Sequence, residues 1–111
     1  MRSNVAAVGL ALLAVPAVAA TSITAIVDDP ARFAGREVTV GGTVTEQSIG
    51  YGGESVYTIQ DGDRRITVFS RSAPPSRGER LDVSGTVGLR PPDEEFTFPP
   101  IILERERRAA Q

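Results

Sequence analysis

The chain has 111 residues, a formal net charge of −2, and neither cysteine nor histidine. This length fits one domain, and the weakly acidic charge excludes the basic footprint of a typical nucleic-acid-binding domain. Without cysteine and histidine the chain has no disulfide, no thiolate or imidazole metal site, and none of the common nucleophile–base pairs.

Residues 1–20 have the pattern of a secretory signal peptide. A positive charge at Arg2 precedes the apolar run Val5–Val15, which is shorter than the roughly 20 residues that span a bilayer. Small residues follow, and cleavage is expected after Ala19 or Ala20. An uncleaved anchor is the alternative. We therefore expect a periplasmic or secreted protein with no membrane span after cleavage.

The folded domain is expected over residues 21–104, and it opens with a short helix. Ser22 fits the helix N-cap, and apolar residues three and four positions apart follow in Ile23–Val27. Pro30 prevents a long continuation, and Gly35 releases the chain into a strand.

One ten-residue phrase occurs twice, as GREVTVGGTV at 35–44 and as GERLDVSGTV at 78–87, with five identical positions. In each copy apolar residues alternate with a period of two, which predicts strands over 37–46 and 80–89. Glycine in mid-strand indicates a bend or a bulge. We interpret the two copies as two long bent strands that close a small barrel.

Two further strands are predicted between the copies, over 55–60 and 64–70. Asp61-Gly62 between them is typical of a tight hairpin. The proline-rich segment 73–78 is expected to be a loop.

A fifth strand is expected at 95–98, with an interruption at Pro99-Pro100 and a continuation at 101–103. Residues 105–111 are predicted to be a charged C-terminal tail that frays into solvent. The fold class is therefore all-β, a five-stranded barrel with a short N-terminal helix, preceded by a signal peptide. The expected core residues are Val38, Val40, Val44, Tyr57, Ile59, Ile66, Val68, Leu81, Val83, Val87 and an isoleucine near position 101.

The pattern of these strands resembles a known fold. Gly-x-x-Val-x-Val-x-Gly-x-Val, Tyr-x-Ile-x-Asp-Gly, Ile-x-Val and Gly-Glu-x-Leu-x-Val-x-Gly-x-Val follow one another between Gly35 and Val87. They resemble the OB-fold, closest to the nucleic-acid-binding group like the anticodon-binding domains of tRNA synthetases. The resemblance implies a ligand face on the outside of strands two and three. The helix that usually joins strands three and four has no room in segment 73–78.

Two exported OB-fold groups are also similar. The first is the haem chaperone of cytochrome c maturation, which attaches haem through a histidine that this chain lacks, so that function does not carry over and no cofactor is expected. The second comprises small periplasmic proteins of the stress-associated type, which match in shape and compartment.

The outer face of strands two and three holds the candidate ligand site. Phe69 lies between two arginines on this face, and could stack on a ring while the arginines meet phosphate or carboxylate. Alternatively, Phe69 covers a barrel end and the arginines are solvated. Val56 and Gln60 share the face, and Tyr51 in a glycine-rich loop is a second candidate. The candidate binding residues are Arg65, Thr67, Phe69, Arg71, Tyr51 and Thr58.

No catalytic residue and no metal ligand is predicted. Asp61 and Asp63 flank Gly62 as in a hairpin turn, and a calcium loop needs more oxygen ligands. We expect an exported, non-enzymatic, monomeric binding module. Its ligand stays open among an oligosaccharide, a peptide, an envelope protein and a nucleic acid, the last disfavoured by charge and export. The alternative is an assembly protein that docks on an envelope partner through segment 90–100 or a strand edge.

Overall fold

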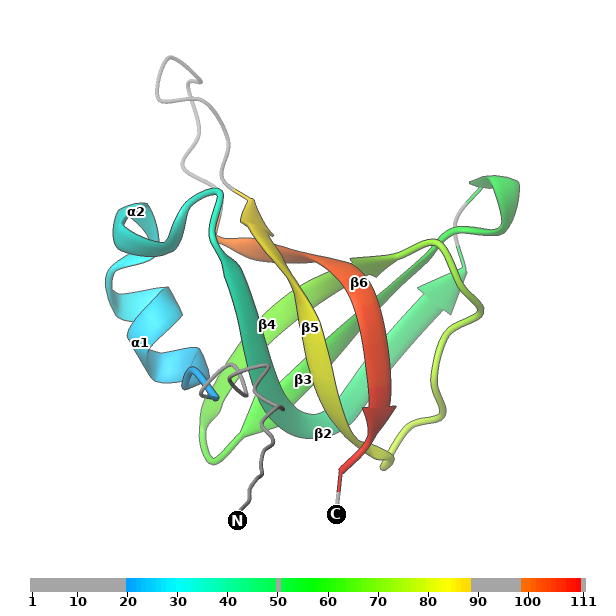
Figure 1. The fold of residues 1–111 in the computed structure, drawn as a ribbon. Helices are drawn as coiled ribbons and strands as arrows, with labels where there is room; N and C mark the ends of the chain where they lie inside the picture. The colour runs from blue at the N-terminus through cyan, green and yellow to red at the C-terminus, as the bar shows by residue number, and fades with distance from the viewer. Residues whose placement is uncertain (1–19, 50, 89–98, 111) are drawn as a thin grey trace, which may run out of the picture.

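The computed structural model describes residues 20–49, 51–88 and 99–110. In this part of the chain two short helices and a 3-10 turn accompany five strands, which form one closed barrel in the order β2-β3-β4-β6-β5 (Figure 1). The all-β class and the short N-terminal helix are confirmed. The elements are α1 (Ile23–Asp28), α2 (Pro30–Phe33), β2 (Glu37–Ile49), η2 (Tyr51–Gly53), β3 (Ser55–Asp61), β4 (Arg64–Ser70), β5 (Arg80–Gly88) and β6 (Ile101–Ala109).

Strand β2 belongs to both halves of the barrel. Its first part pairs with β5 as far as Thr43, and its second part pairs with β3 from Thr43 onward. Thr45 has no partner on β3, so a bulge turns the strand there. Gly42 lets the strands cross closely, because a Cβ at this position would lie 2.9 Å from the carbonyl oxygen of Gln60. The prediction of a strand shared by both halves is confirmed, and the strand continues to Ile49.

Strand β5 also bends at a bulge, where it pairs with β6. Ser84 lies opposite Glu106 and Gly85 opposite Glu104, so Arg105 is the extra residue of a bulge. A Cβ on Gly85 would lie 2.2 Å from the carbonyl oxygen of Leu103, which only a glycine avoids. The doubled phrase therefore marks the two places where the barrel wall bends.

Strand β6 corrects the predicted tail. Residues 105–109 continue the strand that begins at Ile101 and pair with β5 as far as Leu81, opposite Ala109. Their run of charged residues has low strand propensity, but β5 supplies the backbone hydrogen bonds and solvent accepts the side chains. The strand predicted at 95–98 and residues 1–19 of the proposed signal sequence 1–20 lie outside the described residues.

The core matches the predicted inward set. Every residue of that set is buried, and Ile102 is the isoleucine near position 101. Helix α1 adds Ile23 and Ile26 to this core, and the Ser22 hydroxyl caps the helix by accepting a 3.0 Å hydrogen bond from the amide of Ala25. Asp28 at the other end of α1 is 2.7 Å from Arg64 on β4. Within the described ranges no helix has the length and apolarity needed to cross a membrane.

Candidate ligand-binding groove

The outer face of β3 and β4 carries the residues that alternation predicted. Phe69 lies opposite Val56, Thr67 opposite Thr58, and Arg65 opposite Gln60. Phe69 and Arg65 are exposed and the other four are partly buried, whereas the residues between them on each strand are buried. The predicted outward set therefore forms rows across two strands.

Strand β6 extends one of these rows by an apolar residue. It runs parallel to β4, and Leu103 lies opposite Phe69. Val56, Phe69 and Leu103 thus form an apolar strip across three strands. Much of this strip is exposed to solvent, since Phe69 is 44% and Leu103 47% exposed.

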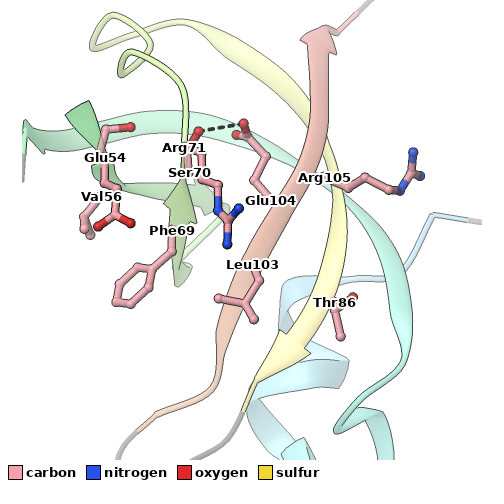
Figure 2. A pocket seen from close by; sticks show the side chains of 10 residues that line it. Glu54, Val56, Phe69, Ser70, Arg71, Thr86, Leu103, Glu104 and Arg105 are labelled. Carbon is pink, nitrogen blue, oxygen red and sulfur yellow. Dashed lines mark hydrogen bonds between the residues drawn. The ribbon is translucent and has the colours of Figure 1, made fainter. Parts of the chain in front are cut away.

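A groove of about 590 Å³ opens on this strip where β4 and β6 separate (Figure 2). Beyond the Phe69–Leu103 pair the two strands no longer pair, and their side chains form the walls. We call it the β4–β6 groove. Its lining residues are Glu54, Ser55, Val56, Phe69, Ser70, Arg71, Thr86, Leu103, Glu104 and Arg105.

Only part of the predicted site lies in this groove. Phe69 and Arg71 line it, and Figure 2 shows Arg71 between Phe69 on one side and the β6 residues on the other. Arg65 and Thr67 lie nearer the start of β4, outside the groove. Thr58 lines a neighbouring hollow of about 320 Å³ on the β2 side.

Tyr51 lies in the turn η2, and its side chain is outside the described part of the structure. The prediction for this residue therefore stays a prediction.

Sequence reasoning missed the β6 wall of the groove. Leu103 and Glu104 line it together with Arg105, which falls in the segment predicted to be a frayed tail. A usable signal was present: in the apolar triplet Ile101-Ile102-Leu103, burial of the central isoleucine turns Leu103 outward, since neighbouring side chains alternate between the faces.

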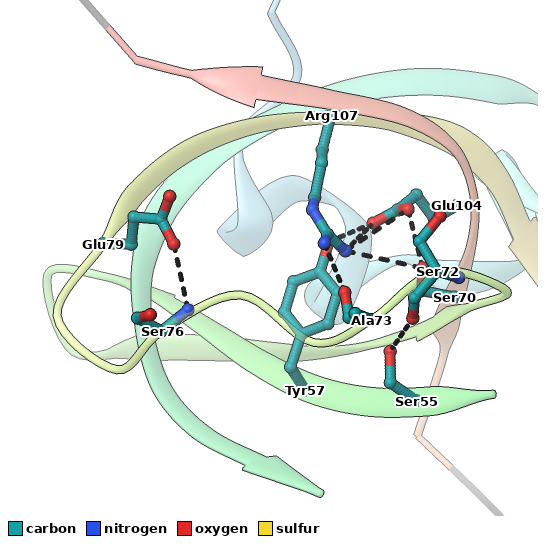
Figure 3. A network of polar contacts seen from close by, with 9 residues as sticks. All are labelled: Ser55, Tyr57, Ser70, Ser72, Ala73, Ser76, Glu79, Glu104 and Arg107. Atoms are coloured by element: carbon teal, nitrogen blue, oxygen red, sulfur yellow. Dashed lines mark hydrogen bonds and ion pairs between the residues drawn. The ribbon is translucent and has the colours of Figure 1, made fainter. Parts of the chain in front are cut away.

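The floor of the groove is a hydrogen-bonded carboxylate (Figure 3). Glu104 is only 6% exposed, and its oxygens accept bonds from the Tyr57 hydroxyl, from the Ser70 hydroxyl at 2.7 Å and from Arg107 at 3.2 Å. A buried charge is tolerated when it is paired and its acceptor positions are filled. The floor is therefore electrically balanced and structural.

The same network holds the loop between β4 and β5. Arg107 donates to the carbonyl of Ala73, the Ser55 hydroxyl donates to the carbonyl of Ser72 at 2.7 Å, and Gln47 donates to that of Pro75 at 3.2 Å. The described residues of this connection contain no helix, as the short proline-rich segment predicted.

Tyr57 is held neutral in this setting. Burial of its hydroxyl, and then the neighbouring Glu104 carboxylate, raise the pKa of Tyr57 well above its ordinary value. The Arg107 guanidinium lies 5.5 Å from the centre of the Tyr57 ring. Tyr57 therefore acts as a hydrogen-bond donor to Glu104 under ordinary conditions.

No protein-family model matches the sequence, and no curated protein matches it significantly. Solved structures do. Aspartyl-tRNA synthetase from Entamoeba histolytica matches 83% of this chain with a TM-score of 0.67 and 16% identity, and asparaginyl-tRNA synthetase from Pyrococcus horikoshii matches 86% with a TM-score of 0.63 and 13% identity. The matched parts are 21% and 24% of those chains, so this chain spans about a quarter of their length or less.

A third similar structure is an OBody bound to hen egg-white lysozyme. It matches 86% of this chain and 96% of its own length, with a TM-score of 0.62 and 18% identity. Identities this low establish the fold alone. Together with the closed five-stranded barrel they show that the chain is an OB-fold domain.

Proposed function

We propose that the chain is an exported, non-enzymatic binding module that holds a protein partner in the β4–β6 groove. The observation that carries this proposal is the apolar strip of Val56, Phe69 and Leu103, which is half-exposed inside a concave site. Exposed apolar surface in a concavity costs solubility unless a partner covers it.

A protein partner suits the groove better than a nucleic acid. The carboxylate of Glu54 lines it, its two arginines form no continuous cationic track, and Phe69 is the sole aromatic among the described lining residues. Single-stranded nucleic acids are held by several aromatic platforms along a cationic track. The OBody bound to lysozyme supports the idea that a free-standing OB barrel of this size can take a protein ligand.

Two further arguments support the rest of the proposal. The absence of histidine and cysteine from the sequence removes the usual nucleophile–base pairs, which favours binding over catalysis. The signal-peptide pattern of residues 1–20 favours export. Mass spectrometry of the chain recovered from outside the cytosol tests the second point, because a retained residue 1 would contradict cleavage.

Site-directed photo-crosslinking tests the binding site. A benzoylphenylalanine at position 69 should crosslink one discrete partner, and the same probe at Arg36, which is exposed and does not line the groove, should not. Adding Leu103→Ser to the variant with the probe at position 69 should abolish the crosslink. Equal crosslinking from both positions would refute the groove as the binding site.

Nucleic acid is tested directly by anisotropy with a labelled oligothymidylate. Phosphate-driven binding weakens steeply as salt rises, whereas apolar contacts do not. Salt-sensitive binding that Phe69→Ser abolishes would replace the protein partner with a nucleic acid.

An assembly role through a strand edge is the second candidate. Strand β2 continues from Glu46 to Ile49 beyond its last pairing with β5, and Ile49 is 71% exposed. A strand edge of this kind can pair with a partner strand. Loss of a complex on Ile49→Lys, with the groove crosslink unchanged, would favour this role. The other docking segment considered, 90–100, lies mostly outside the described residues.

A further inference from the structure

We infer that the β4–β6 groove recognises an acidic peptide segment, one that places an apolar side chain on Phe69 and Leu103 and a neighbouring carboxylate on Arg71. This inference rests on the proposed function and adds the chemistry of the partner.

The apolar half of the recognition comes from the shape of the groove. Phe69 and Leu103 lie side by side in the parallel β4–β6 pair, and Val56 and Thr86 lie on either side of them in the lining. A volume of about 590 Å³ is sufficient for a large side chain and its flanking backbone. The adjoining side chains of Val56, Phe69 and Leu103 favour an apolar side chain over a phosphate chain.

The charged half follows from which charges are already paired. Glu104 is paired with Arg107, and Arg105 is paired with Glu37 at 2.5 Å. In the described part of the chain no acidic side chain forms an ion pair with Arg71. Arg71 is therefore the groove cation that a ligand can bind without displacing a partner in the described part of the chain.

The position of Arg71 suits a carboxylate next to an apolar residue. Figure 2 shows its side chain between Phe69 and the β6 residues that line the groove. A guanidinium binds a carboxylate through two parallel hydrogen bonds, and this pairing strengthens where apolar neighbours exclude water.

Glu54 gives the groove a direction. It lines the groove on the side of β3, and it has no ion pair among the described residues. A ligand carboxylate is repelled there and attracted by Arg71, so a continuous row of phosphates fits poorly. The two charges favour a peptide with a defined orientation.

Titration of the ¹⁵N-labelled protein with short peptides tests this chemistry. The probes are Ser/Gly-flanked heptapeptides whose central triplets are Glu-Phe-Glu, Gln-Phe-Gln, Lys-Phe-Lys and Glu-Ala-Glu. We expect the first to shift the amides of 69, 71 and 103, and to bind about tenfold more tightly than the second. Glu-Ala-Glu should not bind measurably, because the apolar contact is lost.

Two arginine variants separate a specific contact from overall charge. Arg71→Gln should remove the difference between the Glu-Phe-Glu and Gln-Phe-Gln peptides. Arg65→Gln, an equal charge change on β4 but outside the groove, should preserve it.

The opposite results would overturn the inference. Equal or tighter binding of Lys-Phe-Lys, or equal loss in both arginine variants, would exclude acidic recognition by Arg71. The protein-binding function would survive that result if the crosslink from position 69 persists. An oligothymidylate that shifts the groove amides when no peptide does would overturn both.

Discussion

The inner and outer faces of the paired strands β4 and β6 differ in where they place polar and apolar side chains. Toward the interior, Ser70 and Glu104 are buried and hydrogen-bonded, with Arg107 neutralising the carboxylate. Toward solvent, one residue earlier on each strand, Phe69 and Leu103 expose nearly half of their surface. The usual order of polar outside and apolar inside is inverted at this point.

The inversion separates a structural polar cluster from the proposed binding surface. The inner polar cluster joins β3, β4, β6 and the following loop where the strands stop pairing, so it closes the barrel. Its polar groups already form hydrogen bonds within the protein, so few donors or acceptors remain to bind a ligand. The outer apolar pair, Phe69 and Leu103, lies where these strands stop pairing, and about half of its surface is exposed to solvent.

The largest expected effect is on the inner side. Arg107→Met leaves the Glu104 carboxylate buried without its cation, and should lower the free energy of unfolding by about 3–5 kcal/mol. Arg105→Met is the control, since its ion pair with Glu37 is exposed and should be worth less than about 1 kcal/mol. Urea unfolding measures both, and equal losses would mean that the inner cluster does not close the barrel.

The bend that shapes the β6 wall comes next. Gly85→Ala places a Cβ against the backbone of Leu103 and should cost about 2–3 kcal/mol. Gly41→Ala is the matched control, because its Cβ would meet the side chain of Asp82 at 3.0 Å, which can move. Thermal unfolding followed by circular dichroism should rank Gly85→Ala well below Gly41→Ala, and the reverse order would argue against the observed register.

The Tyr57 hydroxyl should have a smaller effect that depends on pH. The pKa of Tyr57 is raised in the folded protein, so its stabilisation is complete below the unfolded value near 10 and is lost as pH rises above it. Between this value and the folded pKa, stability should fall by about 1.4 kcal/mol per pH unit. Tyr57→Phe should cost about 1.5 kcal/mol at pH 7.

Unfolding measured from pH 9 to 11 checks this linkage. The fall above pH 10 should be absent or much weaker in Tyr57→Phe. An equal fall in both proteins would show that Tyr57 ionises freely.

The smallest effect on stability, and the largest on binding, is expected outside. Leu103→Ser removes a side chain that is about half buried, and should lower the free energy of unfolding by about 1 kcal/mol. The expected result is loss of the complex with the protein partner in size-exclusion chromatography, with a melting temperature lowered by no more than about 4–8 °C. Severe destabilisation would make the strip part of the core instead.

Much of the fold follows from local sequence. Alternation with a period of two sorted each strand into faces, so the inward set from Val38 to Val87 was predicted and is buried. The doubled phrase marked both bends, and Asp61-Gly62 marked the hairpin between β3 and β4. These signals are local because side-chain direction and turn conformation depend on neighbouring residues.

The groove depends on contacts between distant segments. Leu103 lies beside Phe69 only because β6 pairs in parallel with β4, and residues 105–109 become a strand only because β5 lies next to them. Glu104 and Arg107 look like surface charges in the sequence. The Glu104 side chain is buried and that of Arg107 partly buried because Tyr57 and Ser70 converge on them. The sequence by itself determined the barrel and its core, through periodicity. The tertiary structure decided which charges are buried and which apolar residues stay exposed, because both depend on partners more than thirty positions away.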